Sequence, residues 1–188
     1  MPGTIATPYQ VKGIPQLTQD FIPAYPFLEE WTQQLKPTMI LEAGTGYGDA
    51  TRLLATLIQP YRGRLTTIDT QLPQCPLDWF QAYPNVTVIR ATRSDWIWAT
   101  PVHLLMVNSH LTEENPMVAC STLLFRLWAC VTSPGLILVH GVRHQETGSK
   151  LQAMLQSFAL HQRAKFYLYP TPMGLGALEK GVIVRTSS

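Results

Sequence analysis

The segment that decides the fold is MILEAGTGYGD, residues 39–49. An apolar run reaches Glu42, and glycines follow at alternate positions, Gly44, Gly46 and Gly48. This pattern predicts a buried strand, a tight turn and the start of a helix, because glycine is needed where the backbone has a positive φ or lies directly against a ligand. A loop of this kind after a central strand is where open α/β folds bind nucleotide-like molecules.

Short apolar segments alternate with amphipathic segments along the rest of the chain. Strands are expected at residues 38–41, 64–68, 85–89, 102–107 and 136–139, with an antiparallel pair at 164–169 and 181–185 joined by 170–176. Helices are expected at residues 26–35, 50–58, 116–131 and 151–158. Apolar strands between amphipathic helices indicate a parallel sheet covered on both faces.

We therefore predict an α/β fold, a Rossmann-like doubly wound sheet of seven mostly parallel strands with an antiparallel edge strand. Residues 1–188 are expected to form a single domain, because no repeat or low-complexity block interrupts the series. Residues 1–25, rich in proline and polar residues, are expected to form an extended arm or lid.

The composition limits the partners of the chain. Charged residues make up 14% of it and the net charge is +2, which argues against nucleic-acid binding. No apolar stretch reaches the roughly 20 residues of a membrane helix. Cys75, Cys120 and Cys130 share no metal-like spacing, so we expect reduced thiols in a cytoplasmic protein. The apolar composition is compatible with a homodimer, although the sequence points to no interface.

The glycine segment resembles motif I of the class I S-adenosylmethionine-dependent methyltransferases, written (D/E)-x-G-x-G-x-G. The resemblance implies that Glu42 and the loop Gly44, Thr45, Gly46, Tyr47 and Gly48 bind the cofactor S-adenosyl-L-methionine. The dinucleotide fingerprint G-x-G-x-x-G/A would need glycine or alanine at Asp49. A nicotinamide-dependent oxidoreductase is therefore the weaker hypothesis.

Further cofactor contacts are implied by the same resemblance. Asp69 ends the second predicted strand 25 residues after Gly44, where the family has an acid that binds the ribose hydroxyls, and Thr70 follows it. After the third strand, the family places a small residue and an acid near the adenine. Ser94, Asp95 and Trp96 match this place. Asp95 would accept from the exocyclic amine, or else it caps a turn.

The second half resembles the small-molecule O-methyltransferases of this fold, including sugar-modifying and catechol-type enzymes. That group has Asp-Gly-x-His after strand four and His-Asp after strand five, and metal-dependent members bind a divalent cation with these acids. This chain has Asn108 and Gly141 at the two acid positions. A hard cation prefers carboxylate oxygens, so we expect a metal-independent reaction.

The strand ends also supply candidate catalytic residues. His140 is expected to act as a general base or to hold a structural hydrogen bond, and Asn108 to orient substrate or water. His110 either contacts substrate or caps its loop. Arg143 and His144 would contact an anionic substrate, or else they are solvated loop residues. A zinc site made by the three histidines is conceivable, but their spacing does not require one.

Two hypotheses from different classes follow. The first is a methyltransferase that uses S-adenosylmethionine on a small-molecule or sugar hydroxyl, and the intact glycine loop with Asp69 favours it. The second is an inactive relative that keeps the fold as a binding or assembly module, and Asn108 with Gly141 favours it.

Overall fold

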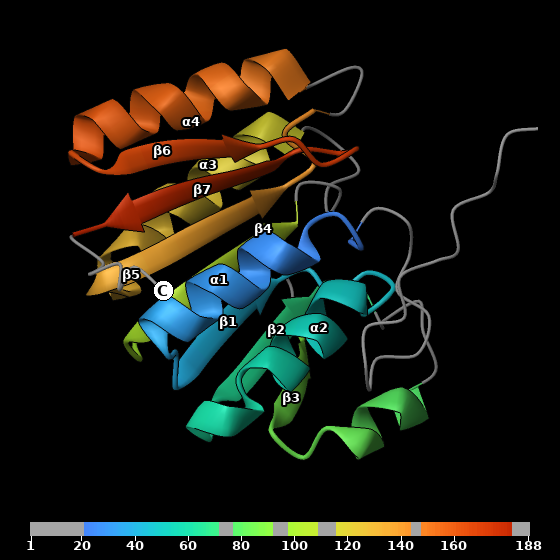
Figure 1. The fold of residues 1–188 in the computed structure, drawn as a ribbon. Coiled ribbons are helices and arrows are strands. Elements are labelled where there is room, and N and C mark those ends of the chain that lie inside the picture. The colour runs from blue at the N-terminus through green and yellow to red at the C-terminus, as the bar shows by residue number, and fades with distance from the viewer. Residues whose placement is uncertain (1–20, 72–76, 92–97, 109–115, 144–147, 182–188) are drawn as a thin grey trace, which may run out of the picture.

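The structure is a computed structural model, and it describes residues 21–71, 77–91, 98–108, 116–143 and 148–181. Its centre is a seven-stranded sheet in the order β3-β2-β1-β4-β5-β7-β6 (Figure 1). The strands are β1 (Met39–Ala43), β2 (Arg64–Asp69), β3 (Val86–Arg90), β4 (Val102–Asn108), β5 (Val131–His140), β6 (Lys165–Tyr169) and β7 (Leu175–Lys180). The first five run parallel, whereas β7 is antiparallel to β5 and β6. The predicted fold class is confirmed.

Helices pack on both faces of the sheet (Figure 1). On one face, α1 (Tyr25–Leu35) and α2 (Asp49–Leu57) bury an apolar cluster that includes Leu28 and Leu54. On the other, α3 (Pro116–Leu127) and α4 (Gly148–Gln162) bury a second cluster that includes Leu124 and Leu155. Three short 3-10 helices complete the described elements: η1 (Gln59–Tyr61), η2 (Leu77–Ala82) and η4 (Trp128–Cys130). None of the described helices is long and apolar enough to cross a membrane.

The limits of the first two helices follow from local chemistry. Pro26 lies in the first turn of α1, where a missing N–H costs nothing, and Lys36 ends that helix with a φ of 46° just before Pro37. Gly48 is the N-cap of α2 and has a φ of 77°. The helix start is therefore fixed by the last glycine of the loop, and the Thr51 hydroxyl near that start donates to Glu42 of β1.

The last strand differs from the prediction. Residues 181–185 were expected to form it, but β7 covers Leu175–Lys180, and residues 182–185 lie outside the described residues. The glycines of this segment suggested a connection. In the structure, β7 is almost fully buried between β5 and β6, and a Cβ on Gly176 would lie 3.1 Å from Leu155 Cδ1 of α4. Close helix packing, rather than a turn, explains this glycine.

The helix predicted at residues 116–131 is also shorter than expected. It ends at Leu127, η4 follows, and β5 begins at Val131 rather than at residue 136. The apolar residues around Trp128 continue the helical pattern in sequence. Val131 nevertheless pairs with Val102 of β4, so the sheet extends into a segment that periodicity assigned to the helix.

Candidate functional site

The candidate site lies at the carboxyl ends of β1, β2, β4 and β5. The strand order reverses between β1 and β4, and this switch point is where open α/β sheets bind ligands. Side chains alternate along a strand, so Glu42, Asn108 and His140 share the face covered by α1 and α2. The residues two positions before them belong to the core on that face: Ile40, Met106 and Leu138.

The glycine loop has the predicted strand–turn–helix form. Gly44, Gly46 and Gly48 all have positive φ values, 96°, 50° and 77°. The Gly44 N–H donates to the Ile68 carbonyl at 2.7 Å, and the Gly48 N–H donates to the Thr45 carbonyl at 2.8 Å. Residues other than glycine rarely adopt this conformation, so the alternating glycines are required by the backbone itself.

The space beside Gly46 is open. A Cβ built on this residue would find one atom of the described residues within 4 Å, Asn108 Nδ2 at 3.9 Å. Tyr47 at the tip of the loop is 65% exposed. The loop therefore offers bare backbone between β1 and the end of β4, as a cradle for a ligand requires.

Asp69 anchors the loop from the end of β2. Its Oδ2 accepts hydrogen bonds from the backbone N–H groups of Thr45 and Gly46, at 3.0 and 3.2 Å. Its Oδ1 accepts from the Gln71 N–H at 3.2 Å, and the Thr70 hydroxyl lies 3.5 Å away. The carboxylate is buried. Asp69 therefore holds the loop in shape, a role that the sequence pattern did not indicate.

Glu42 is fully buried beneath the start of α2. The Thr51 hydroxyl of α2 donates to its Oε2 at 2.5 Å, and Oε1 has no hydrogen-bond partner among the described residues. Burial raises the pKa of this carboxyl to about 7; the nearby charge of Asp69 adds to the rise, and the Thr51 and Thr67 hydroxyls oppose it. Glu42 therefore keeps its proton up to a higher pH than an exposed glutamate does, and it lies next to the glycine loop.

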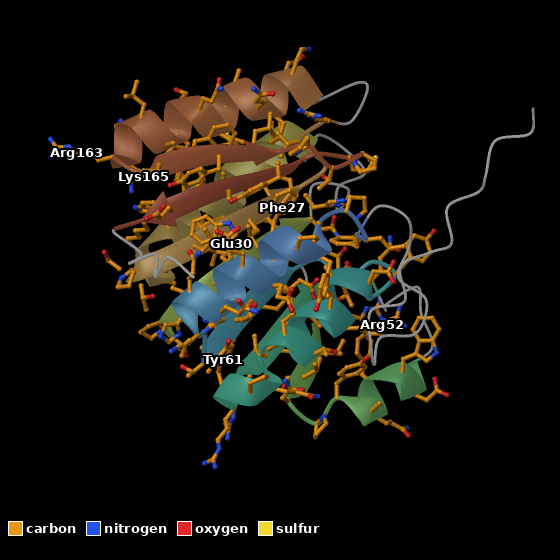
Figure 2. All side chains as sticks on the ribbon, in the orientation of Figure 1. Phe27, Glu30, Arg52, Tyr61, Arg163 and Lys165 are labelled. Atoms are coloured by element: carbon orange, nitrogen blue, oxygen red, sulfur yellow. The ribbon has the colours of Figure 1, made fainter. Side chains whose placement is uncertain are left out.

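A buried ion pair lies in the first turn of α2. Arg52 Nη2 is 2.6 Å from Asp49 Oδ1, and both side chains are buried. The guanidinium carbon of Arg52, which is labelled in Figure 2, lies 4.2 Å from the centroid of the Trp79 ring. This contact joins η2 to α2. The spacing of Asp49 and Arg52 on a helix could have indicated the pair from sequence, but the Trp79 contact could not.

Asn108 and His140 meet across the ends of β4 and β5. Their register pairs them directly, and Asn108 Oδ1 is 3.2 Å from His140 Nδ1. Phe21, just before α1, stacks on the imidazole with ring centroids 4.4 Å apart and an angle of 27° between planes. His140 is 4% exposed. No sequence pattern indicated Phe21, because its contact with His140 joins distant segments.

Arg143 follows β5 and has a fixed backbone. Its N–H donates to the Met173 carbonyl at 2.7 Å, and a Cβ on Gly174 would lie 2.6 Å from its Cγ. The β6–β7 turn is therefore packed on the Arg143 stem. The side chain is exposed, and no carboxylate of the described residues forms an ion pair with it.

Several predicted site residues remain predictions. Ser94, Asp95, Trp96, His110 and His144 lie outside the described residues. Within the described ranges, no group of three or more His, Cys, Asp or Glu side chains is arranged to hold a metal ion. The residues that the structure does bring to one edge of the sheet are Glu42, the glycine loop, Asp69, Thr70, Asn108, His140 and Arg143.

Comparisons with known proteins show which solved structures share this fold. No protein-family model and no curated protein sequence matches the chain. Among solved structures, a candidate caffeoyl-CoA O-methyltransferase from Staphylococcus aureus matches with a TM-score of 0.70 and 13% identity, over 91% of this chain and 88% of that one. The O-methyltransferase TomG from Streptomyces achromogenes, solved with SAM, matches with a TM-score of 0.65 and 15% identity, over 88% and 82%.

A third similar structure is the SAH-bound methyltransferase PaMTH1 from Podospora anserina. It has a TM-score of 0.64 and 14% identity, over 85% of this chain and 78% of that one. The three matches each extend over most of both chains. At this level of identity they define an architecture rather than an activity. The chain has the fold of the class I methyltransferases, as found in these three methyltransferases.

Proposed function

We propose that the protein is an S-adenosylmethionine-dependent methyltransferase that acts on a small-molecule or sugar hydroxyl without a metal ion. The observation that carries the proposal is the open backbone at Gly46, between the Asp69 anchor and Asn108. Similar structures contain the cofactor or its product: TomG binds SAM, and PaMTH1 and the plantazolicin methyltransferase BpumL bind SAH.

The residues present fit this cofactor. Positive φ values along the loop leave its backbone uncovered, so Gly44, Gly46 and Gly48 can lie against the ligand. Asp69 accepts from three backbone N–H groups and, at 3.5 Å, from the Thr70 hydroxyl, and a hydroxyl of the ribose would take the place of this long Thr70 contact. Thr70 stands beside it. When bound, S-adenosylmethionine supplies a sulfonium-bound methyl group for transfer to the acceptor oxygen.

The acceptor side belongs to the ends of β4 and β5. His140 takes the proton that the acceptor hydroxyl loses, and Asn108 orients the imidazole. Arg143, exposed and fixed at its backbone, pairs with an anionic group of the acceptor. We keep Ser94, Asp95 and Trp96 as adenine contacts and His110 and His144 as acceptor contacts.

Calorimetry with S-adenosylhomocysteine tests the cofactor. We expect one binding site in the natural protein. Gly46→Ala should weaken binding by roughly tenfold or more, because the methyl group enters the space of the ligand and overpacking costs about 1–3 kcal/mol. A natural protein that shows neither binding heat nor a thermal shift would rule out the proposal.

Gly181→Ala is the matched control for this variant. Gly181 also has a positive φ, 78°, and a Cβ there would meet the Ser133 side chain, at the opposite edge of the sheet. Both variants carry the backbone strain of a non-glycine residue in this region. Only Gly46→Ala should lose affinity; equal losses would mean that strain, rather than ligand contact, explains the effect.

Chelation tests the metal independence. Neither β4 nor β5 ends in an acid, because Asn108 and Gly141 occupy those positions. We therefore expect the rate of S-adenosylhomocysteine release to be the same with excess EDTA and with added magnesium. A rate that falls with EDTA and returns with magnesium would show that other residues bind a cation.

A further inference from the structure

The imidazole of His140 is held from two sides. Asn108 Oδ1 lies 3.2 Å from its Nδ1, and Phe21 stacks on the ring plane at 4.4 Å. The strand register places Asn108 beside His140 on β4, and Leu175 beside it on β7. None of these three neighbours is charged. Asn108 and Phe21 therefore give the ring a defined orientation through contacts that carry no charge.

The contact with Asn108 selects the position of the imidazole proton. An amide oxygen can only accept a hydrogen bond, so the contact requires a proton on Nδ1. A neutral imidazole carries one proton, and Nε2 then has the lone pair. The other end of the amide, Nδ2, is the atom that faces Gly46 and the open space beside the loop.

We propose that Asn108 is a positioning residue that holds His140 in the Nδ1–H tautomer, so that Nε2 is the atom that accepts a proton. The tautomer is a property of the chain alone. Its use in catalysis rests on the proposed function: Nε2 would take the proton of the acceptor hydroxyl as the oxygen bonds to the methyl carbon and the bond from that carbon to the sulfonium sulfur breaks. The imidazolium would later return the proton to water.

The proposal explains how a site without the usual acids keeps an oriented base. A carboxylate next to Nδ1 would fix the same tautomer and also stabilise the imidazolium. The amide of Asn108 supplies the orientation but no charge. Replacing Asn108 by Asp, which has the same shape, therefore separates the two effects.

Nuclear magnetic resonance of the full chain with isotope-labelled histidine reports the tautomer without any assay of activity. The chain has five histidines, so the spectrum of His140→Gln identifies the His140 signals. We expect the natural protein to carry the proton on Nδ1. Asn108→Asp should keep it there and move the titration midpoint upward by about one pH unit or more, because the new charge favours the imidazolium.

Two further variants complete the test. Asn108→Ala removes the acceptor and should give a mixture of both tautomers, whereas Phe21→Leu removes the stack but keeps the hydrogen bond, and should leave the proton on Nδ1. A proton on Nε2 in the natural protein, or an unchanged tautomer in Asn108→Ala, would overturn the proposal. Binding of S-adenosylhomocysteine is measured separately, so a protein with this tautomer but no binding would refute the proposed function alone.

Discussion

The two sides of the candidate site differ in charge. On the β1–β2 side, the carboxylates of Glu42, Asp49 and Asp69 are all buried, and each has a partner: a threonine hydroxyl, an arginine, or backbone N–H groups. On the β4–β5 side, the two strands contain no acidic residue, and the site is formed by Asn108 and His140. One side contains three buried acids, and the other has an oriented pair of side chains and no acid.

This difference separates two tasks. The β1–β2 side fixes a backbone cradle, because its acids hold the glycine loop and the start of α2 in place. Under the proposed function, the β4–β5 side would present a base, His140, whose proton position is set by the Asn108 amide. If the division is real, substitutions on one side change binding of the cofactor, and substitutions on the other change the transfer step.

His140→Ala should have the largest effect. Removing a general base typically lowers the rate by about 10²–10⁴-fold, whereas affinity for S-adenosylhomocysteine should stay within about twofold, since the cradle is on the other side. Turnover and calorimetry on the same preparation measure both. His161→Ala, at the last turn of α4, is the control that should change neither.

This variant can break the comparison. Loss of cofactor binding in His140→Ala would show that the two sides work as a unit. Normal turnover in His140→Ala would remove this residue as the base.

Glu42→Gln should have the next largest effect, on stability. The carboxyl ionises near pH 4.5 in the unfolded chain and at about 7 in the folded protein. Between these values only the folded state keeps the proton, so the free energy of unfolding falls as pH rises. The loss is about 3 kcal/mol by pH 7 and is complete about one pH unit higher. Glutamine imitates the protonated acid and avoids the loss.

Urea unfolding at pH 5 and pH 8 measures this difference. Glu42→Gln should become more stable relative to the natural protein by roughly 2–3 kcal/mol over that interval. Glu30→Gln is a suitable control, because Glu30 is an exposed residue of α1 (Figure 2). Parallel pH dependence in Glu42→Gln and the natural protein would mean that Glu42 is ionised within the folded protein.

The glycine loop could be predicted because its signal is local. Three alternating glycines after an apolar strand specify backbone conformations at Gly44, Gly46 and Gly48 without any knowledge of distant residues. The parallel sheet followed from the same kind of pattern, repeated along the chain. β7 was expected at residues 181–185 and lies at Leu175–Lys180, and Gly176 contributed to this error because it had two explanations, a turn or close packing against Leu155.

The contacts that give the site its chemistry could not be predicted, because they join distant segments. Phe21 reaches His140 only after α1 has packed on the sheet, and Trp79 reaches Arg52 only through the placement of η2. The role of Asp69 was not predicted either. An acid at the end of a strand suggested a ligand contact, whereas in the structure Asp69 accepts hydrogen bonds from the backbone of the glycine loop.

Asp69→Asn should weaken cofactor binding. The loss of affinity should be smaller, as a fold-change, than the loss of rate in His140→Ala. Asp69 Oδ2 accepts from two loop N–H groups and Oδ1 from a third. Asparagine keeps one acceptor oxygen and places an NH₂ donor against at least one N–H group. Hydrogen bonds to charged groups contribute about 1.5–3 kcal/mol, so we expect roughly tenfold weaker binding of S-adenosylhomocysteine. Unchanged affinity would show that the loop needs no anchor.

Trp79→Leu should have the smallest effect. It tests how much the contact between Trp79 and Arg52 stabilises the β1–β2 side. The ring covers a guanidinium that is already paired with Asp49 at 2.6 Å. A cation–π contact of this kind contributes about 0.5–2 kcal/mol, so unfolding should become easier by about 1 kcal/mol. Trp79→Phe keeps a ring face and should lose less. If the two variants have the same free energy of unfolding, the indole stabilises the protein by packing rather than by its cation–π contact. In that case packing alone holds η2 against α2.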